Sequence, residues 1–213
     1  MRLALATANR HKVREIADIL KGLPVTLITP ADYPEYVPPE ETGATFLQNA
    51  ALKAVAFARE TGLPCLADDS GLEVRYLDGR PGVRSARYAG PEDDYRANNE
   101  KLLAELKGIP PEKRGGAFRC VIVLYDPGRR IVAPTLRRRQ VDGELMGVFE
   151  GRVEGVIAAE PRGSAGFGYD PLFIWPPAGL TFAQMTPEAK NAVSHRAAAL
   201  EKFAGFLKSA EIA

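Results

Sequence analysis

The stretch RLALATANRHKVREIADILKGLPVTLI, residues 2–28, predicts a strand, a helix and a second strand in close succession. Apolar residues run from Leu3 to Ala6, and further apolar positions then recur at helical spacing as far as Leu20. Asn9 stands where a helix N-cap is expected, and a glycine and a proline end the helix before the next apolar run. This β-α-β order favours an α/β fold.

The rest of the chain continues the alternation and then becomes rich in strands. Further helices are expected at residues 45–61, 95–106 and 195–209. Apolar or β-branched runs predict strands at residues 65–67, 72–77, 117–125, 130–140 and 148–158. We therefore expect one large domain, residues 1–213, or two closely joined lobes that share a core, built on a mixed sheet whose later strands form an antiparallel meander.

Composition excludes several classes of protein. The chain has 213 residues, of which 46% are apolar and 26% charged, as in ordinary globular domains. No apolar run approaches the roughly 18 residues of a membrane-spanning helix, and the N-terminal run ends too early for a signal peptide. We therefore expect a cytoplasmic protein without a membrane segment. The net charge of +1 means that any anion site must be local.

Cysteine and histidine usage narrows the metal chemistry. Cys65 and Cys120 lie in apolar strand-like runs, which predicts small buried side chains rather than a disulfide or a zinc pair. His11 and His195 are the only histidines, too few for a multi-histidine centre. A hard cation bound through carboxylates is favoured instead.

Two lysines are candidates for contact with a polyphosphate. Residues 7–12 join a strand to a helix, where free backbone N–H groups and the Lys12 ammonium favour an anion. Lys53 lies four residues after Asn49, on the border of the apolar face of the next helix. An asparagine cap beside a solvated lysine, and a lysine extending over the edge of the core, are the alternative interpretations.

Adjacent carboxylates at Asp68 and Asp69, followed by Ser70 and Gly71, come directly after a predicted buried strand. Two carboxylates in a row repel each other, so a nearby cation would relieve an electrostatic cost. Together with Glu41 they offer the oxygen ligands that suit Mg²⁺. The same residues are also typical of an ordinary turn, which stays an open alternative.

Two later segments could read a nucleobase. Residues 166–171, GFGYDP, place aromatic rings and an acid between glycines, which suits stacking on a base or, alternatively, a turn packed into the core. Lys190 and His195 could share a ligand only if the helix is interrupted between them, so we expect Ser194 to cap a new helix beginning at His195. A structural histidine and an Arg196 ion pair are the alternatives.

Six sequence blocks occur together in a recognisable order. They are TxNxxKxxE from Thr7, ETGxTFxxNA from Glu41, ADDSGL from Ala67, PGVxSARY from Pro81, GFGYDPLF from Gly166 and SHR from Ser194. With these blocks the chain resembles the inosine triphosphate pyrophosphatase family, the Ham1-like purine nucleoside triphosphate pyrophosphatases of bacterial type. Gln184 stands where that family is expected to have glutamate.

The resemblance implies a two-lobed α/β fold around a long mixed sheet, a homodimer, and an active cleft between the lobes. It implies Mg²⁺-dependent hydrolysis of ITP, dITP and XTP to the monophosphate and pyrophosphate. Such a reaction requires charge neutralisation and an attacking water, which lysines, a metal ion and a carboxylate base supply without a covalent nucleophile.

The same resemblance implies roles for single residues. Those that bind the triphosphate are Thr7, Ala8, Asn9, Arg10, His11, Lys12 and Lys53. The metal ligands are Glu41, Asp68 and Asp69, and Asp69 with Lys53 forms the catalytic group. Ser70 contacts substrate, and the base pocket is formed by Phe167, Gly168, Tyr169, Asp170, Lys190, His195 and Arg196. A purine keto oxygen would accept hydrogen bonds from Arg196 or His195, whereas adenine presents an amine.

Two other interpretations remain. Residues 107–140 contain nine basic and two acidic residues, which could bind nucleic acid, although a charged strand edge that prevents aggregation is favoured. The related Maf-like pyrophosphatases are the other alternative, and the GFGYD and SHR blocks argue against them.

Overall fold

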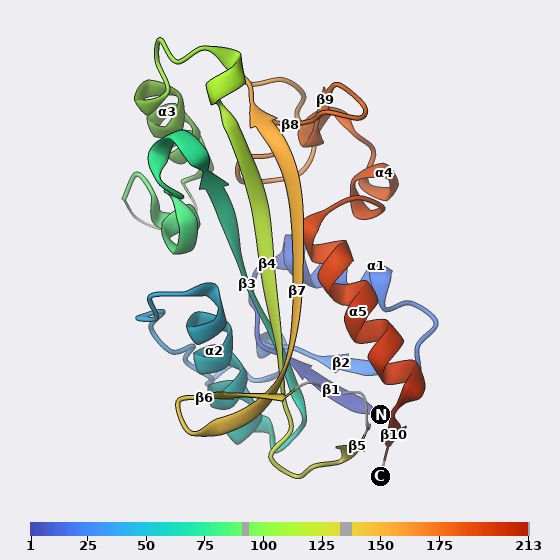
Figure 1. Cartoon of the computed structure of the whole chain (residues 1–213). Helices are drawn as coiled ribbons and strands as arrows, with labels where there is room; N and C mark the ends of the chain where they lie inside the picture. The colour runs from blue at the N-terminus through green and yellow to red at the C-terminus, as the bar shows by residue number, and fades with distance from the viewer. Residues whose placement is uncertain (91–93, 133–137, 213) are drawn as a thin grey trace. The chain divides into compact units, whose positions relative to one another are not determined.

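The computed structural model describes residues 1–90, 94–132 and 138–212, which divide into two compact units. Unit 1 comprises Met1–Asp69, Cys120–Gly151 and Arg196–Ala213, and unit 2 comprises Ser70–Arg119 and Arg152–His195. Three strands run from one unit into the other along the chain: β3 (Cys65–Val74), β4 (Gly115–Tyr125) and β7 (Glu144–Ile157). Each unit is therefore assembled from segments far apart in the sequence (Figure 1).

Unit 1 contains a mixed sheet in the order β2-β1-β3-β4-β7, with β6 also paired to β7. Its strands are β1 (Arg2–Leu5), β2 (Thr26–Ile28), β6 (Arg138–Val141) and the unit 1 parts of β3, β4 and β7. β1 pairs in parallel with β2 and β3, whereas β6 and β7 are antiparallel. A separate antiparallel pair joins β5 (Ile131–Val132) to β10 (Glu211–Ile212).

Helices cover both faces of the unit 1 sheet. Leu3 and Leu5 pack with α1 (Arg10–Ile19) and α5 (His195–Ser209), while Ala4 packs with α2 (Phe46–Thr61). Successive strand residues point to opposite faces, so one short strand supplies both cores. Phe203 of α5 is fully buried and meets the Phe149 ring edge-on at a centroid distance of 5.4 Å. Figure 1 shows α1 and α5 together and α2 across the sheet from them.

Unit 2 holds the other parts of β3, β4 and β7, followed in the sheet by β8 (Phe173–Trp175) and β9 (Leu180–Thr181). Its helices are α3 (Tyr95–Glu105), α4 (Pro187–Asn191) and the 3₁₀ segments η2 (Arg75–Leu77), η3 (Gly82–Arg87), η4 (Pro111–Lys113) and η5 (Phe182–Gln184). Aromatic rings form much of its core, with the Phe118 ring 4.6 Å from Phe173 and 5.9 Å from Phe182. One further 3₁₀ turn, η1 (Pro30–Asp32), belongs to unit 1.

The α/β class and the mixed sheet are confirmed, and the four predicted helices begin within one residue of their expected starts. Asn9 and Thr45 accept backbone N–H groups as caps, and α5 begins at His195 after a separate short helix that ends at Asn191. Cys65 and Cys120 are buried and free. Among the described residues, no helix is long and apolar enough to cross a membrane.

Three strand predictions need correction. The strand expected at 72–77 stops at Val74, because residues 75–77 form the 3₁₀ turn η2. The expected interruption at residues 68–71 is wrong, because β3 runs without a break from Cys65 to Val74. Pairing within the sheet outweighs the local turn preference of the Asp-Ser-Gly sequence. The strand predicted at 130–140 is represented by β5 and β6, and its middle, residues 133–137, lies outside the described residues.

Candidate active site

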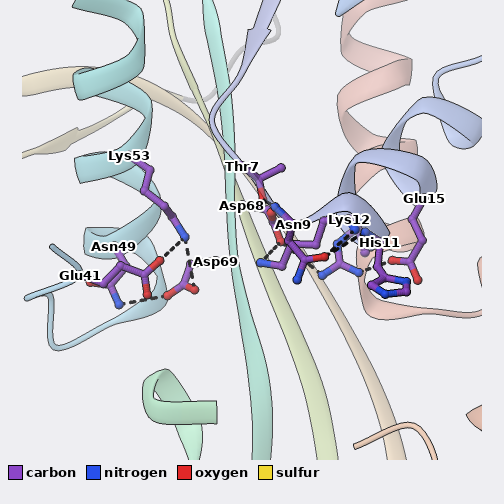
Figure 2. A network of polar contacts seen from close by, with 11 residues as sticks. Thr7, Asn9, His11, Lys12, Glu15, Glu41, Asn49, Lys53, Asp68 and Asp69 are labelled. Atoms are coloured by element: carbon purple, nitrogen blue, oxygen red, sulfur yellow. Dashed lines mark hydrogen bonds and ion pairs between the residues drawn. The ribbon is translucent and has the colours of Figure 1, made fainter. Parts of the chain in front are cut away.

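The consecutive acids Asp68 and Asp69 lie inside β3 rather than in a turn. Because side chains alternate along a strand, the two carboxylates point to opposite faces of the unit 1 sheet. Asp68 lies with groups from α1 and α5, and Asp69 lies with groups from α2. Figure 2 shows these as two groups of contacts, one on each side of the strand.

On one face, Asp68 is enclosed by cations. Its Oδ2 lies 3.0 Å from the Lys12 ammonium and 3.3 Å from a guanidinium nitrogen of Arg196, which also bonds to Glu15. Burial acts to raise the pKa of Asp68, but Lys12 and Arg196 outweigh it and hold that pKa below its ordinary value. Asp68 is therefore a charged anchor for the two cations at neutral pH.

On the other face, Asp69 shares a cation with Glu41. The Lys53 ammonium lies 2.6 Å from Glu41 Oε1 and 3.6 Å from Asp69 Oδ1, and the Asn49 amide donates to Asp69 Oδ2 at 3.1 Å. Burial raises the pKa of Asp69 although Lys53 opposes the change. Burial acts to lower the pKa of Lys53, but Asp69 and Glu41 raise it above its ordinary value. This group thus combines a carboxylate of raised basicity with a fixed positive charge.

The junction between β1 and α1 has the predicted cap geometry. Asn9 Oδ1 accepts from the backbone N–H groups of His11 and Lys12 at 3.0 and 3.3 Å. Thr7 Oγ1 accepts from the Asn9 N–H at 3.3 Å. Of the other predicted phosphate-binding residues, Ala8, Arg10 and His11 are exposed at the helix start. The positive end of the α1 dipole therefore lies beside Lys12.

In unit 2, a buried ion pair organises residues 166–171, the segment predicted to contact the nucleobase and called the base segment from here on. Asp170 Oδ2 accepts from the Lys190 ammonium at 2.6 Å and from the Phe167 N–H at 2.9 Å. The same ammonium lies 4.9 Å from the centre of the Phe167 ring. Gly166 has a φ of +77°, and a Cβ there would lie 2.1 Å from Asp170 Oδ2. The segment needs glycine at this position because it folds tightly onto its own carboxylate.

The remaining predicted residues of unit 2 lie in its core or at its edge. The His195 ring stacks on Phe118 at a centroid distance of 4.8 Å, and His195 is buried. The Tyr169 hydroxyl donates to the Ser85 carbonyl at 2.9 Å, and burial raises the pKa of that hydroxyl. Ser70, also in unit 2, is half-buried on β3. The structure thus joins Phe167, Asp170 and Lys190 directly, whereas His195 and Tyr169 each contact other parts of unit 2.

The three predicted metal ligands do not form one group. Within residues 1–90, 94–132 and 138–212, no three His, Cys, Asp or Glu side chains lie close enough together to hold a metal ion. Glu41 and Asp69 meet at Lys53, while Asp68 lies on the opposite face with Lys12. The repulsion expected between adjacent carboxylates is therefore avoided by strand geometry.

Several residues were given no role from the sequence. Glu15 contacts Arg196, and its position one helical turn after Lys12 was the available signal. Asn49 is fully buried between Asp69 and the Gly43 N–H, which donates to Asn49 Oδ1 at 2.8 Å. Asn99 of α3 binds a carbonyl of the base segment, and no motif pointed to it.

Two other sequence features have structural explanations. Gln184 accepts from the Thr181 N–H at 3.0 Å in a capping box, a role that glutamine and glutamate both fill. In the basic segment, Arg119 lies 3.6 Å from Glu73 and Arg139 lies 3.1 Å from Glu150, so these two charges are locally compensated. Arg137, the first of three consecutive arginines, lies outside the described residues.

Comparison with known proteins identifies relatives over nearly the whole chain. A dITP/XTP pyrophosphatase of Geobacter sulfurreducens is 51% identical over 199 residues, covering 93% of this chain and 92% of that protein. A dITP/XTP pyrophosphatase of Yersinia pseudotuberculosis is 44% identical, covering 98% and 99%. A HAM1 protein structure from Coxiella burnetii matches with a TM-score of 0.82 and 38% identity, covering 98% of each chain.

A second structure, the Staphylococcus aureus Ham1 protein, matches with a TM-score of 0.79 and 36% identity over 98% of each chain. The sequence also matches the model of the Ham1 family over residues 3–206, a range that includes both carboxylate groups and the base segment. On this evidence the chain belongs to the Ham1 family.

Proposed function

We propose that this protein hydrolyses ITP, dITP and XTP to the nucleoside monophosphate and pyrophosphate, and so removes deaminated purines from the nucleotide pool. The observation that carries the proposal is the group formed by Asp69, Lys53 and Glu41, which places a carboxylate of raised pKa beside a fixed cation. The names of the relatives, dITP/XTP pyrophosphatases, supply the substrate class.

In this proposal Asp69 accepts a proton from the attacking water. A base works best when its pKa lies closer to the working pH, and burial shifts the pKa of Asp69 in that direction. Lys53 offsets negative charge that develops on the phosphates during attack. Lys12 and the start of α1 bind the phosphates that are not attacked. The exposed residues Ala8, Arg10 and His11 complete this phosphate-binding segment.

Mg²⁺ fits the side of β3 that carries Asp69. This assignment is supported by the contacts of Glu41 and Asp69, which both lie near one positive charge, the Lys53 ammonium. Mg²⁺ in nucleotide enzymes needs only one or two carboxylates, since phosphates and waters complete its octahedron. When bound, the ion would neutralise phosphate charge; we assign its protein ligands to Glu41 and Asp69. Asp68 is left out of this set, although the family resemblance implies it, because it lies on the opposite face of β3 with Lys12.

For the purine we keep the residues that the family resemblance implies. Phe167 supplies a ring for stacking, and Asp170 and Lys190 hold the segment around it. His195 and Arg196 are the proposed donors to the keto oxygen, with Ser70 as a further substrate contact. Both Asp68 and Glu15 contact Arg196, so the contact of Arg196 with the base needs an experiment of its own.

The test is an assay with a panel of nucleoside triphosphates and Mg²⁺ in which pyrophosphate and orthophosphate are measured separately. We expect pyrophosphate and IMP from ITP, little turnover of ATP, and complete loss of activity with EDTA. Stepwise release of orthophosphate would contradict the proposed bond cleavage. Light scattering would test the proposed homodimer, and cell fractionation the proposed cytoplasmic location.

A further inference from the structure

Helix α3 lies outside every motif assigned above, yet it directs two side chains at the base segment of unit 2. The Asn99 amide donates to the Gly168 carbonyl at 3.0 Å, and the Tyr95 ring lies 6.1 Å from the Phe167 ring at an angle of 45°. Residues four apart share one face of a helix, so both contacts come from the same side of α3.

The hydrogen bonds within the base segment join its two ends, and the backbone between them is bound by Asn99. Phe167 and Asp170 are joined to each other by the Phe167 N–H bond to the carboxylate and by a backbone bond of 3.3 Å. Gly168, between them, has a left-handed φ of +62°. Among the described residues, Asn99 contributes the side-chain hydrogen bond that holds the Gly168 backbone.

Fixing the Gly168 carbonyl also fixes the next N–H group. The peptide group is planar and trans, so the N–H of Tyr169 points away from the carbonyl oxygen that Asn99 binds. Within the described part of the chain, that N–H has no hydrogen-bond acceptor. It follows the Phe167 ring by two residues, which makes it a candidate donor next to the stacking surface.

We propose that Asn99 is a positioning residue for base selection: by holding the Gly168 carbonyl, it orients the Tyr169 N–H as a donor to the keto oxygen of a deaminated purine. An N–H group donates to a keto oxygen and has nothing to accept from the amine of adenine. The inference deepens the proposed function and rests on it. Tyr95 supports the same segment by contact with the Phe167 ring.

The experiment compares Asn99→Ala with Asn98→Ala, using kcat/KM for ITP and for ATP. Asn98 is a matched control, because its amide also donates to a backbone carbonyl at 3.0 Å, that of Ala86, and not to the base segment. We expect Asn99→Ala to narrow the ITP/ATP ratio by about five- to tenfold, mainly through a higher KM for ITP, as for one lost hydrogen bond. We expect Asn98→Ala to lower the fraction of folded protein and therefore to lower the measured kcat/KM for ITP and for ATP by the same factor. The ratio of the two kcat/KM values should be unchanged.

A second variant, Asn99→Asp, keeps the size of the side chain and removes its N–H donor, so it should narrow the ratio in the same way. Hydrogen exchange gives a readout without substrate: the amides of residues 167–170 should exchange faster in Asn99→Ala than in Asn98→Ala or wild type. An unchanged ratio in both Asn99 variants, or an equal change in Asn98→Ala, would overturn the inference.

The wild-type assay separates this inference from the proposed function. If the wild-type protein releases no pyrophosphate from ITP, the proposed function is wrong and base selection by Asn99 is wrong with it. If the wild type turns over ITP selectively and both Asn99 variants keep the same ITP/ATP ratio, only the role of Asn99 is wrong.

Discussion

At the scale of single residues, the two consecutive aspartates of β3 have different environments. Asp68 has a lowered pKa and two cations, while Asp69 has a raised pKa and shares Lys53 with Glu41. The difference arises because alternate strand residues face different layers of helices. A carboxylate with raised pKa and a neighbour that stays charged is the arrangement expected of a base and its electrostatic support.

Asp69→Asn should lower kcat for ITP by about 10²-fold or more, because the amide keeps the shape of the side chain but cannot accept the proton. Steady-state kinetics at saturating Mg²⁺, with the far-ultraviolet circular dichroism of the variant, measures this. Asp68→Asn is the partner variant. A near-normal kcat for Asp69→Asn together with a large loss for Asp68→Asn would assign the base to Asp68.

Arg196→Ala should lower the free energy of unfolding by about 3 kcal/mol, since the buried guanidinium contacts both Asp68 and Glu15. Arg152→Ala is the control: its side chain is 45% exposed and pairs with Glu73 and Glu154, so a loss below about 1 kcal/mol is expected. Urea unfolding at pH 7 measures both. An equal loss in the free energy of unfolding for both variants would contradict the stabilising role assigned to the buried contacts of Arg196.

The kinetics of the same Arg196 variant test its proposed contact with the base. If the guanidinium donates to the keto oxygen, Arg196→Ala should reduce the preference for ITP over ATP. Expressed as a free energy from the ratio of the two kcat/KM values, the reduction should be about 1 to 3 kcal/mol. Lys12→Ala is the control, because a phosphate contact weakens both substrates alike. A ratio unchanged in Arg196→Ala would move base reading to His195 and the segment around Gly168.

At the scale of elements, the start of α2 connects the loop that carries Glu41 to β3. Asn49 accepts from the Gly43 N–H and donates to Asp69, so one buried amide is bonded both to the loop before α2 and to β3. Thr45 caps the helix by accepting from the Gln48 N–H. The helix start thereby positions the group to which we assign catalysis.

Gly43→Ala should lower kcat and raise the Mg²⁺ concentration needed for half activity. An added Cβ would lie 2.6 Å from Asn49 Oδ1 and 2.9 Å from the Asn49 nitrogen, so the loop with Glu41 must shift. Gly62→Ala, at the other end of α2, is the control. Its φ of +66° makes alanine cost about 1 kcal/mol of stability, but with no heavy atom within 4 Å it should leave kcat unchanged.

At the scale of the whole molecule, the opposite pKa shifts of the two aspartates predict opposite effects on stability. The pKa of Asp68 is lowered in the folded state, so its charge stabilises the fold above its ordinary value of 3.8 and this is lost as pH falls further. The pKa of Asp69 is raised in the folded state, so the protonated Asp69 carboxyl stabilises the fold below the ordinary value of 3.8. This stabilisation is lost as pH rises through the pKa of the folded state.

Urea unfolding between about pH 3 and pH 7 tests this for wild type, Asp68→Asn and Asp69→Asn. The stability advantage of wild type over Asp68→Asn should shrink as the solution is acidified. Its advantage over Asp69→Asn should instead shrink as pH rises. Parallel curves for the three proteins would show that neither carboxylate changes its pKa on folding.

Local chemistry in the sequence was enough to predict the order of the elements and several boundaries. The cap at Asn9 and the helix beginning at His195 depend on neighbouring residues, so they could be read directly. The order of the six blocks led to the family, which the Ham1 match confirms. Periodicity and caps are properties of adjacent residues and need no knowledge of the fold.

Only the tertiary structure decided which of these residues act together. Glu15 contacts Arg196 across 181 positions, and Asn99 contacts Gly168 across 69. The sequence placed Asp68 and Asp69 side by side as one acidic group and favoured a break in the strand, but pairing in the sheet keeps β3 extended and turns them to opposite faces. Such contacts depend on how strands and helices pack, because burial and charge pairing act between segments that chain position alone does not bring together.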